Sequence, residues 1–144
     1  MKNSIRPVLL SLGGFLFILD RLFKYLSTHD WSGSRLLNSF FGWLPSLNHG
    51  IAFGLPVPGA FIILLSLFFI ALLIWFYIRH ADVFVRAGII LILLGAFSNL
   101  FDRIFFGHTL DYFLVLTSIF NLADVLVVAG AGLCLLMMRK NSPC

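Results

Sequence analysis

The sequence predicts an all-α membrane protein, a bundle of four transmembrane helices with a small, partly β extracytoplasmic element between the first two. Of the 144 residues, 60% are hydrophobic and only 11% are charged, and the mean hydropathy is +1.03. Soluble domains carry about 25% charged residues, so this chain could not cover a surface exposed to water. Its length favours one integral membrane domain over residues 1–144.

Four segments are apolar over the length that a bilayer requires, which is about 20 helical residues for a hydrocarbon core of about 30 Å. They span residues 7–26, 59–78, 87–106 and 119–138. The first has a basic start like a signal peptide, but no small-x-small site follows it, so we expect a retained helix. Residues 27–58 mix Gly, Pro, Ser and Asn with Phe and Trp, which indicates an ordered element with short strands on the membrane surface. Residues 107–118 form a short connection.

Six basic residues lie beside helix ends that would share one side of the membrane: Lys2, Arg6, Arg79, Arg86, Arg139 and Lys140. The positive-inside rule therefore predicts that both termini and the link between the second and third helices are cytoplasmic. Residues 27–58 and 107–118 then lie outside. The formal net charge of +4 comes from scattered residues, which does not indicate a nucleic-acid partner.

All six carboxylates are aspartates, and four of them sit in or against apolar segments: Asp20, Asp102, Asp111 and Asp124. Ionisable groups at membrane depth are costly and are functional candidates by default. Asp111 and Asp124 bracket the start of the last helix. Two carboxylates that converge in a low-dielectric site can share one proton and activate water, so the pair indicates a hydrolase at the membrane edge.

Three pairs of polar residues have spacings that place both members on one helix face: Asp20 with Lys24, Asn99 with Arg103, and Asn121 with Asp124. At about 1.5 Å per residue, all of them fall in the outer third of the bilayer, which favours one shared site. For the first two pairs, contacts that hold helices together are an equally good interpretation. Asp102 is adjacent to Arg103 and points to another face, which favours a structural role.

Five short motifs follow one another along the chain: Asp20-Arg-Leu-Phe-Lys24, Asn48-His-Gly50-Ile-Ala52-Phe53, Gly95-Ala-Phe-Ser-Asn99-Leu-Phe-Asp102-Arg103, Leu110-Asp111-Tyr-Phe113 and Phe120-Asn121-Leu-Ala123-Asp124. In these motifs and their order the chain resembles the lipoprotein signal peptidases, the type II signal peptidases of bacteria. The resemblance implies an aspartic endopeptidase that cuts diacylglyceryl-modified prolipoproteins just before the lipidated cysteine.

The resemblance also assigns roles to residues. It implies that Asp111 and Asp124 are catalytic, and that a further set supports them or positions substrate: Asp20, Lys24, Asn48, Gly50, Asn99, Arg103 and Asn121. Partners would be the prolipoprotein and membrane lipid, with no nucleic acid, and we expect a monomer without cofactor or metal. The location implied is the bacterial cytoplasmic (inner) membrane, with the active site at its outer face.

Several residues depart from the family's pattern: Arg21, Leu94, Ser98, Thr109 and Tyr112. The connection between the two catalytic aspartates is also shorter than usual. Leu94 and Ser98 replace glycines, which predicts altered helix packing near Asn99. Thr109 and Tyr112 change the surroundings of Asp111, while every catalytic position is retained.

The main alternative is a small four-helix proton-coupled transporter with a membrane aspartate as proton carrier. Such a transporter requires charged residues near the midplane of the bilayer and a site that can open to both sides of the membrane. The polar residues here lie together near one membrane surface instead. A metallohydrolase is not favoured, because the sequence has no HExxH run and its four histidines lack ligand spacing. Cys134 and Cys144 give no disulfide framework and are best interpreted as packing and tail residues.

Overall fold

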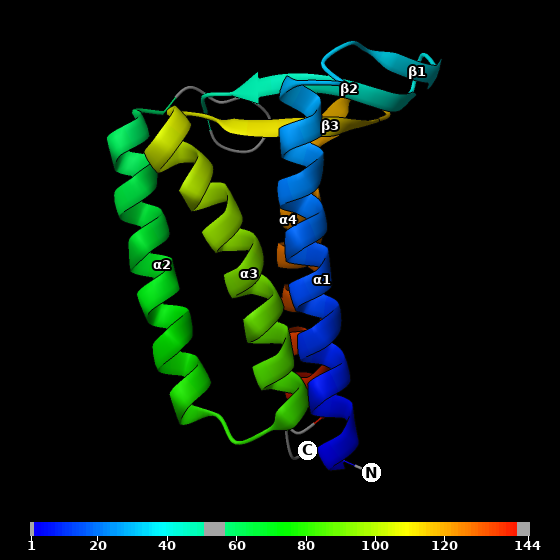
Figure 1. Ribbon diagram of the computed structural model, residues 1–144. Coiled ribbons are helices and arrows are strands. Elements are labelled where there is room, and N and C mark those ends of the chain that lie inside the picture. The colour runs from blue at the N-terminus through cyan, green and yellow to red at the C-terminus, as the bar shows by residue number, and fades with distance from the viewer. Residues whose placement is uncertain (1, 51–56, 141–144) are drawn as a thin grey trace.

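Four helices stand side by side, and a small antiparallel sheet lies across one end of them (Figure 1). The structure is a computed structural model that describes residues 2–50 and 57–140. The helices are α1 (Lys2–Thr28), α2 (Gly59–Arg79), α3 (Val83–Phe106) and α4 (Leu122–Lys140). The first turn of α1 and the last turn of α4 both lie at the end opposite the sheet. The Ile51-Ala52-Phe53 part of the second motif and Cys144 fall outside the described residues.

The four predicted helices are present, and the starts of three of them differ from the prediction. α3 starts at Val83 rather than at residue 87, because the Asp82 side chain caps the helix there by accepting from the N–H groups of Phe84 and Val85. α1 starts at Lys2 rather than at residue 7, because the helix continues through the basic residues before the apolar stretch. α4 starts at Leu122 rather than at residue 119. The residues before it pair as a strand, and Asn121 then caps the helix, since its side-chain oxygen accepts from the Asp124 N–H at 3.0 Å.

The sheet extends beyond the predicted β element of residues 27–58 into residues 109–120, where a short connection and the start of the last helix were expected. The sheet has the order β1-β2-β3-β4, with β1 (Arg35–Asn38) and β2 (Phe41–Asn48) before α2, and β3 (Thr109–Val115) and β4 (Ser118–Phe120) between α3 and α4. β2 and β3 pair antiparallel from Phe41 opposite Val115 to Asn48 opposite Thr109. The physical reason is that β2, with only β1 beside it, would leave one edge of backbone N–H and C=O groups unpaired, and β3 supplies those partners.

Aromatic side chains hold the sheet against the end of α1. The Phe23 ring on α1 packs edge-on against Trp43 of β2 and against Tyr112 and Phe113 of β3, with ring centroids 5.6–5.8 Å apart. The Trp43 indole N–H also donates to the Trp31 carbonyl oxygen at 2.9 Å. These contacts place β3, and with it Asp111, directly over the helices.

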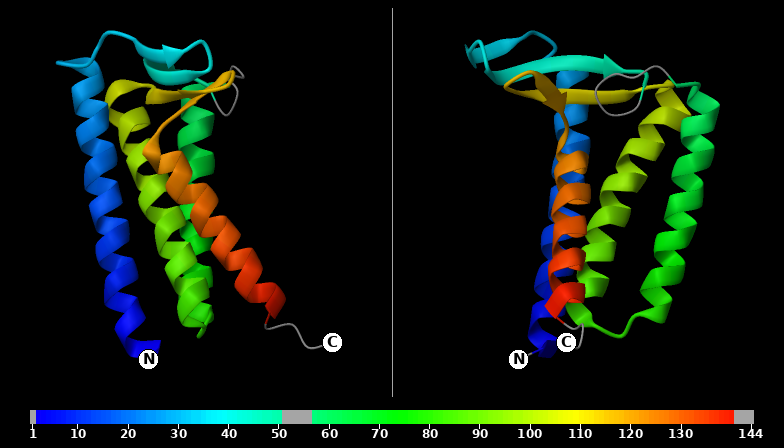
Figure 2. Two further views of the ribbon diagram at one scale, coloured as in Figure 1. Left: turned by 90° about the vertical axis from the view of Figure 1, so that its right-hand side faces the viewer. Right: turned by 180° about the vertical axis from the view of Figure 1, so that it is seen from behind.

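α3 is the central helix and packs closely against α4 through small residues. A methyl group at Gly95 would lie 2.3 Å from the Ala123 carbonyl oxygen, and one at Gly88 would lie 2.7 Å from the Gly130 carbonyl oxygen. Such close backbone approach through glycine is typical of membrane helices. α4 begins beneath the sheet, beside α3, and inclines away from α1 towards its C-terminal end (Figure 2).

Three helices in the described part of the chain are long and apolar enough to cross a membrane, namely α2, α3 and α4. α1 is not among them, and its C-terminal half carries Asp20, Arg21 and Lys24. Large apolar side chains remain exposed on α2, including Leu64, at 66% exposure. A helix surface of this kind is suited to contact with lipid.

Candidate active site

A cavity of about 1140 Å³ opens where the sheet meets the ends of α3 and α4. Six of the nine predicted site residues line it: Asn48, Gly50, Asn99, Arg103, Asp111 and Asp124. They come from β2 and the turn after it, α3, β3 and α4. Residues up to 76 positions apart therefore meet in one polar cavity at one end of the molecule.

Asp111 is buried on β3 and both of its oxygens are hydrogen bonded. Asn48 Nδ2 donates to Oδ2 at 3.0 Å, and Asn121 Nδ2 donates to Oδ1 at 2.7 Å. Burial raises the pKa of Asp111 to about 6, an effect that these two hydrogen bonds oppose and the charge of nearby Asp124 reinforces. The carboxyl group can therefore hold a proton at a pH where an exposed aspartate is fully ionised.

Asp124 occupies the third position of α4 and takes part in a reciprocal cap with Asn121. The Asp124 N–H donates to Asn121 Oδ1 at 3.0 Å, and the Asn121 N–H donates to Asp124 Oδ2 at 3.2 Å. This is the geometry of a capping box, here with an Asn and an Asp. The positive end of the helix dipole and the backbone N–H both favour the charged carboxylate.

Asn121 and Asn99 connect the carboxyl groups of Asp111 and Asp124. Asn121 Nδ2 donates to Asp111 and, at 3.1 Å, to Asn99 Oδ1. Asn99 Nδ2 in turn donates to Asp124 Oδ1 at 2.8 Å. The two amides fix the relative orientation of the carboxylates, because the chain of hydrogen bonds runs from Asp111 through Asn121 and Asn99 to Asp124.

Asp20 and Lys24 do not line the cavity but lie behind it. Asp20 is fully buried, and its Oδ2 pairs with Lys24 Nζ at 3.1 Å, as the i, i+4 spacing predicts. The Asp20 Oδ1 atom accepts from the Tyr112 hydroxyl at 2.9 Å and from the Ala123 N–H at 3.1 Å. An aspartate of α1 thus binds the N-terminus of α4, one residue before Asp124.

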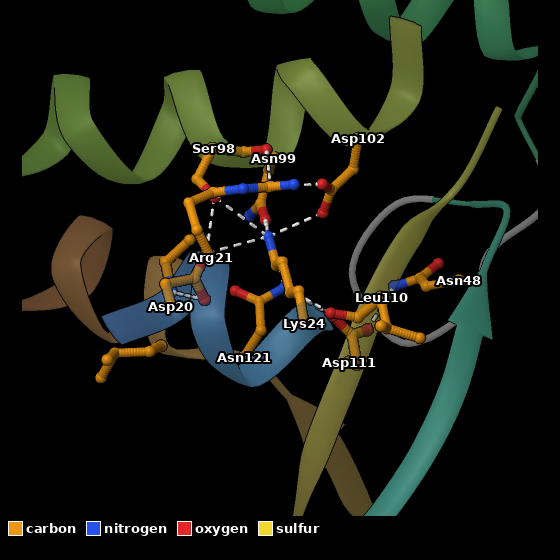
Figure 3. Close-up of polar contacts among 12 residues, drawn as sticks. Asp20, Arg21, Lys24, Asn48, Ser98, Asn99, Asp102, Leu110, Asp111 and Asn121 are labelled. Carbon is orange, nitrogen blue, oxygen red and sulfur yellow. Dashed lines mark hydrogen bonds and ion pairs between the residues drawn. The ribbon is translucent and has the colours of Figure 1, made fainter. Parts of the chain in front are cut away.

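Two cationic and two anionic side chains form a neutral cluster between α1 and α3. Asp102 is buried and pairs with Arg21 and, at 2.7 Å, with Lys24. These ion pairs between α1 and α3 are in keeping with a structural role for Asp102. Ser98 donates to Asp20 at 2.5 Å and accepts from Lys24 at 3.2 Å. Lys24 also donates to Asn99 Oδ1 at 2.9 Å, which links the cluster to the cavity (Figure 3).

Three network residues were missed as site residues by the sequence analysis. Arg21, Ser98 and Tyr112 appear in the sequence only as departures from the family's pattern, yet each contacts Asp20 or Asp102. Their partners lie on other segments, so spacing along the chain does not reveal them. The sequence offers one indication of them: a charged residue that is buried, such as Asp20 or Asp102, requires polar partners somewhere in the fold.

Arg103 reaches across the cavity to the second motif. Its Nη2 donates to the Gly50 carbonyl oxygen at 3.1 Å, which holds the turn after β2 against α3. Within the described residues, Arg103 Nε and the Thr109 hydroxyl are buried without a hydrogen-bond partner. Both residues line the cavity. The same part of the chain contains no group of three or more His, Cys or Asp residues that could hold a metal ion.

The fold and the cavity define a helical membrane protein with a polar site, built around two aspartates, at one end of its helices. The family model for signal peptidase (SPase) II matches residues 12–140, and the chain belongs to this family of proteases. A lipoprotein signal peptidase of Clostridium novyi (strain NT) is 30% identical over 140 residues, which cover 88% of this chain and 95% of that protein.

Further relatives agree with this assignment. A lipoprotein signal peptidase of Clostridioides difficile (strain 630) is 35% identical over 117 residues, covering 78% of this chain and 79% of that protein. Two solved structures of bacterial membrane enzymes share the fold, with TM-scores of 0.83 and 0.81 at 23% and 24% identity. Both cover 94% of this chain, and the matched parts are 89% and 95% of those chains.

Proposed function

We propose that this protein removes signal peptides from diacylglyceryl-modified prolipoproteins, cutting before the lipidated cysteine with Asp111 and Asp124 as the catalytic dyad. The observation that carries the proposal is that both aspartates line one cavity and are joined through Asn121 and Asn99. Membership of the signal peptidase II family supports the reaction class. The relatives' name, lipoprotein signal peptidase, supports the substrate class.

In the proposed mechanism, Asp124 is the charged base and Asp111 is the neutral partner. Ionised Asp124, at the start of α4, accepts a proton from a bound water, whose oxygen attacks the scissile carbonyl carbon. Protonated Asp111, whose pKa is raised to about 6, donates a hydrogen bond to the carbonyl oxygen as negative charge develops there. The proton held by Asp124 then passes to the leaving amine when the C–N bond breaks. The two aspartates share one proton and titrate as a pair.

The remaining site residues position the dyad or the substrate. Asn48, Asn99 and Asn121 orient the carboxylates, because each donates to one of them. Asp20 and Lys24 hold α1, α3 and α4 together behind the cavity. Arg103 and the turn at Gly50, which line the cavity and are joined by a hydrogen bond, bind the peptide.

We further propose that all four helices cross the bacterial inner membrane, with both termini in the cytoplasm and the cavity at the outer face. Apolar side chains on α1, including Phe15 and Ile18, are at least 60% exposed, which suits lipid contact. The sheet and the cavity lie at the end away from Arg79 and Arg86, which stand in the ends of α2 and α3 on either side of the link between these helices (Figure 1). A proton-coupled transporter fits less well, because the cavity lies at one end of the bundle rather than midway.

The test is cleavage of a diacylated prolipoprotein and of the same protein without its lipid. Each buried methylene contributes about 0.8 kcal/mol, so two acyl chains can dominate binding, and the unlipidated protein should be cut at least about 100-fold more slowly. Asp111→Asn and Asp124→Asn should each lower kcat by roughly 100-fold or more, because an amide cannot transfer the proton. Asp30→Asn, an exposed aspartate outside the cavity, is the matched control.

Two results would contradict these assignments separately. Near wild-type turnover in either Asn variant would remove that aspartate from the dyad. Equal cleavage of the lipidated and unlipidated proteins would overturn the lipoprotein specificity, even if the dyad were correct.

A further inference from the structure

His49 and His108 face each other at the rim of the cavity. Their ring centroids are 5.2 Å apart and the rings are inclined by 57°. Asn48 lies opposite Thr109 in the β2–β3 pairing, so the two histidines follow at the next position on each side. His49 is exposed and lines the cavity, and His108 is half-buried beside it.

The separation of the rings fits a shared metal ion. Imidazole is a preferred ligand of zinc, copper and nickel. A tetrahedral zinc ion lies about 2.0–2.1 Å from one nitrogen of each histidine, which places the two ring centroids about 5 Å apart. The observed spacing therefore needs little rearrangement of the backbone to accommodate the ion.

The ring nitrogens are not committed elsewhere. Within the described residues, neither imidazole takes part in a hydrogen bond or ion pair, whereas His29 and His80 each bond a backbone carbonyl of the helix that they follow. An imidazole in its uncharged form has one ring nitrogen with a lone pair that can bind a cation.

We propose that His49 and His108 form a two-histidine site for a divalent transition-metal ion of the zinc class, with water completing its coordination. The bound ion would cross-link the ends of β2 and β3, next to Asn48 and Gly50. Asn48 donates to Asp111, so the end of β2 that the ion would fix lies beside this aspartate. A doubly charged ion bound there would restrict the access of a peptide to the cavity. The inhibitory half of this inference rests on the proposed function, and the binding half does not.

Binding is tested on the full chain in nanodiscs, without an affinity tag, by titration of zinc chloride against a zinc-responsive dye. One equivalent should bind to the wild type. His49→Ala and His108→Ala should each weaken zinc affinity by roughly 10- to 100-fold or more. Loss of a residue that only supports a metal ligand already has an effect of this size. His29→Ala, an exposed histidine at the same end of the molecule, should bind as the wild type does. Unchanged affinity in both site variants would overturn the site.

Inhibition is tested separately by cleavage of a diacylated prolipoprotein. Zinc should inhibit the wild type reversibly, with recovery on addition of EDTA, and His108→Ala should cleave normally and resist zinc. Zinc binding that depends on both histidines but leaves cleavage unaffected would overturn the inhibitory half. If the wild type without zinc cleaved no prolipoprotein, the proposed function would be contradicted. The zinc site would not be, since the dye titration measures zinc binding without any cleavage.

Discussion

The hydroxyl of Tyr112 is expected to be one of the most stabilising single groups in the protein. It donates to Asp20 Oδ1 at 2.9 Å and accepts from the Leu122 N–H at 2.9 Å, at the start of α4. Tyr112 is fully buried. Burial, with Asp20 nearby, raises the pKa of Tyr112 well above its usual range, so the phenol is a proton donor at any working pH.

Tyr112→Phe removes this hydroxyl and little else. A hydrogen bond to a charged group contributes about 1.5–3 kcal/mol, and a buried N–H left without a partner costs about 1–3 kcal/mol. The two effects share one atom and are not fully additive, so we expect a loss of about 2–4 kcal/mol in the free energy of unfolding. At about 3 °C per kcal/mol for a chain of this size, the Tm should fall by about 6–12 °C.

The assay is thermal unfolding in detergent followed by tryptophan fluorescence. Tyr77→Phe is the matched control, because Tyr77 lies on α2 and its ring contacts Arg86 through its face rather than through its hydroxyl. Cleavage should also fall in Tyr112→Phe, by about tenfold, since the first turn of α4 carries Asp124. A Tm within about 1 °C of the wild type would refute the reasoning that this hydroxyl holds α4 to α1.

Two further predictions concern pH and helix packing. Because the folded-state pKa of Asp111, about 6, lies above its unfolded value of 3.8, the native state binds the proton more tightly, and stability should fall by about 3 kcal/mol as pH rises from about 4 to above 6. Unfolding measured across this range should show the slope in the wild type and in Asp30→Asn and a clearly smaller slope in Asp111→Asn; an equal slope in all three would exclude Asp111 as a source of it. Gly95→Ala should lower both stability and cleavage by forcing α3 from α4 below the dyad, whereas Gly132→Ala, with open space around it, should change neither. A Gly95→Ala protein as stable as the wild type would show that this helix contact is not tight.

The parts of the fold that follow from local pattern were predictable from the sequence. α2 and α3 are long apolar runs, and the shared faces of Asp20 with Lys24 and of Asn121 with Asp124 follow from helical spacing. The start of α4 could also have been found, since an Asn three residues before an Asp, ahead of an apolar run, is an N-cap signal.

The sheet and the deeper contacts could not be predicted in the same way. β3 pairs with a strand more than 60 residues away, and nothing within residues 107–118 specifies that partner. The same pairing brings His49 to His108, so spacing along the chain gave no indication of a histidine pair. Arg21 and Tyr112 find their partners on other segments, which only the packed structure brings near.

The neutral cluster between α1 and α3 has a consequence for biogenesis. Lys24 of α1 pairs with Asp20 of the same helix and with Asp102 of α3, and Arg21 pairs with Asp102 as well. Within the described residues, α1 is not among the helices that are apolar enough to span by composition. Alone in lipid, α1 would carry uncompensated charge, whose cost falls only when α3 arrives. The charges of this cluster are therefore balanced only when α3, whose Asp102 lies some 80 residues later in the chain, packs against α1.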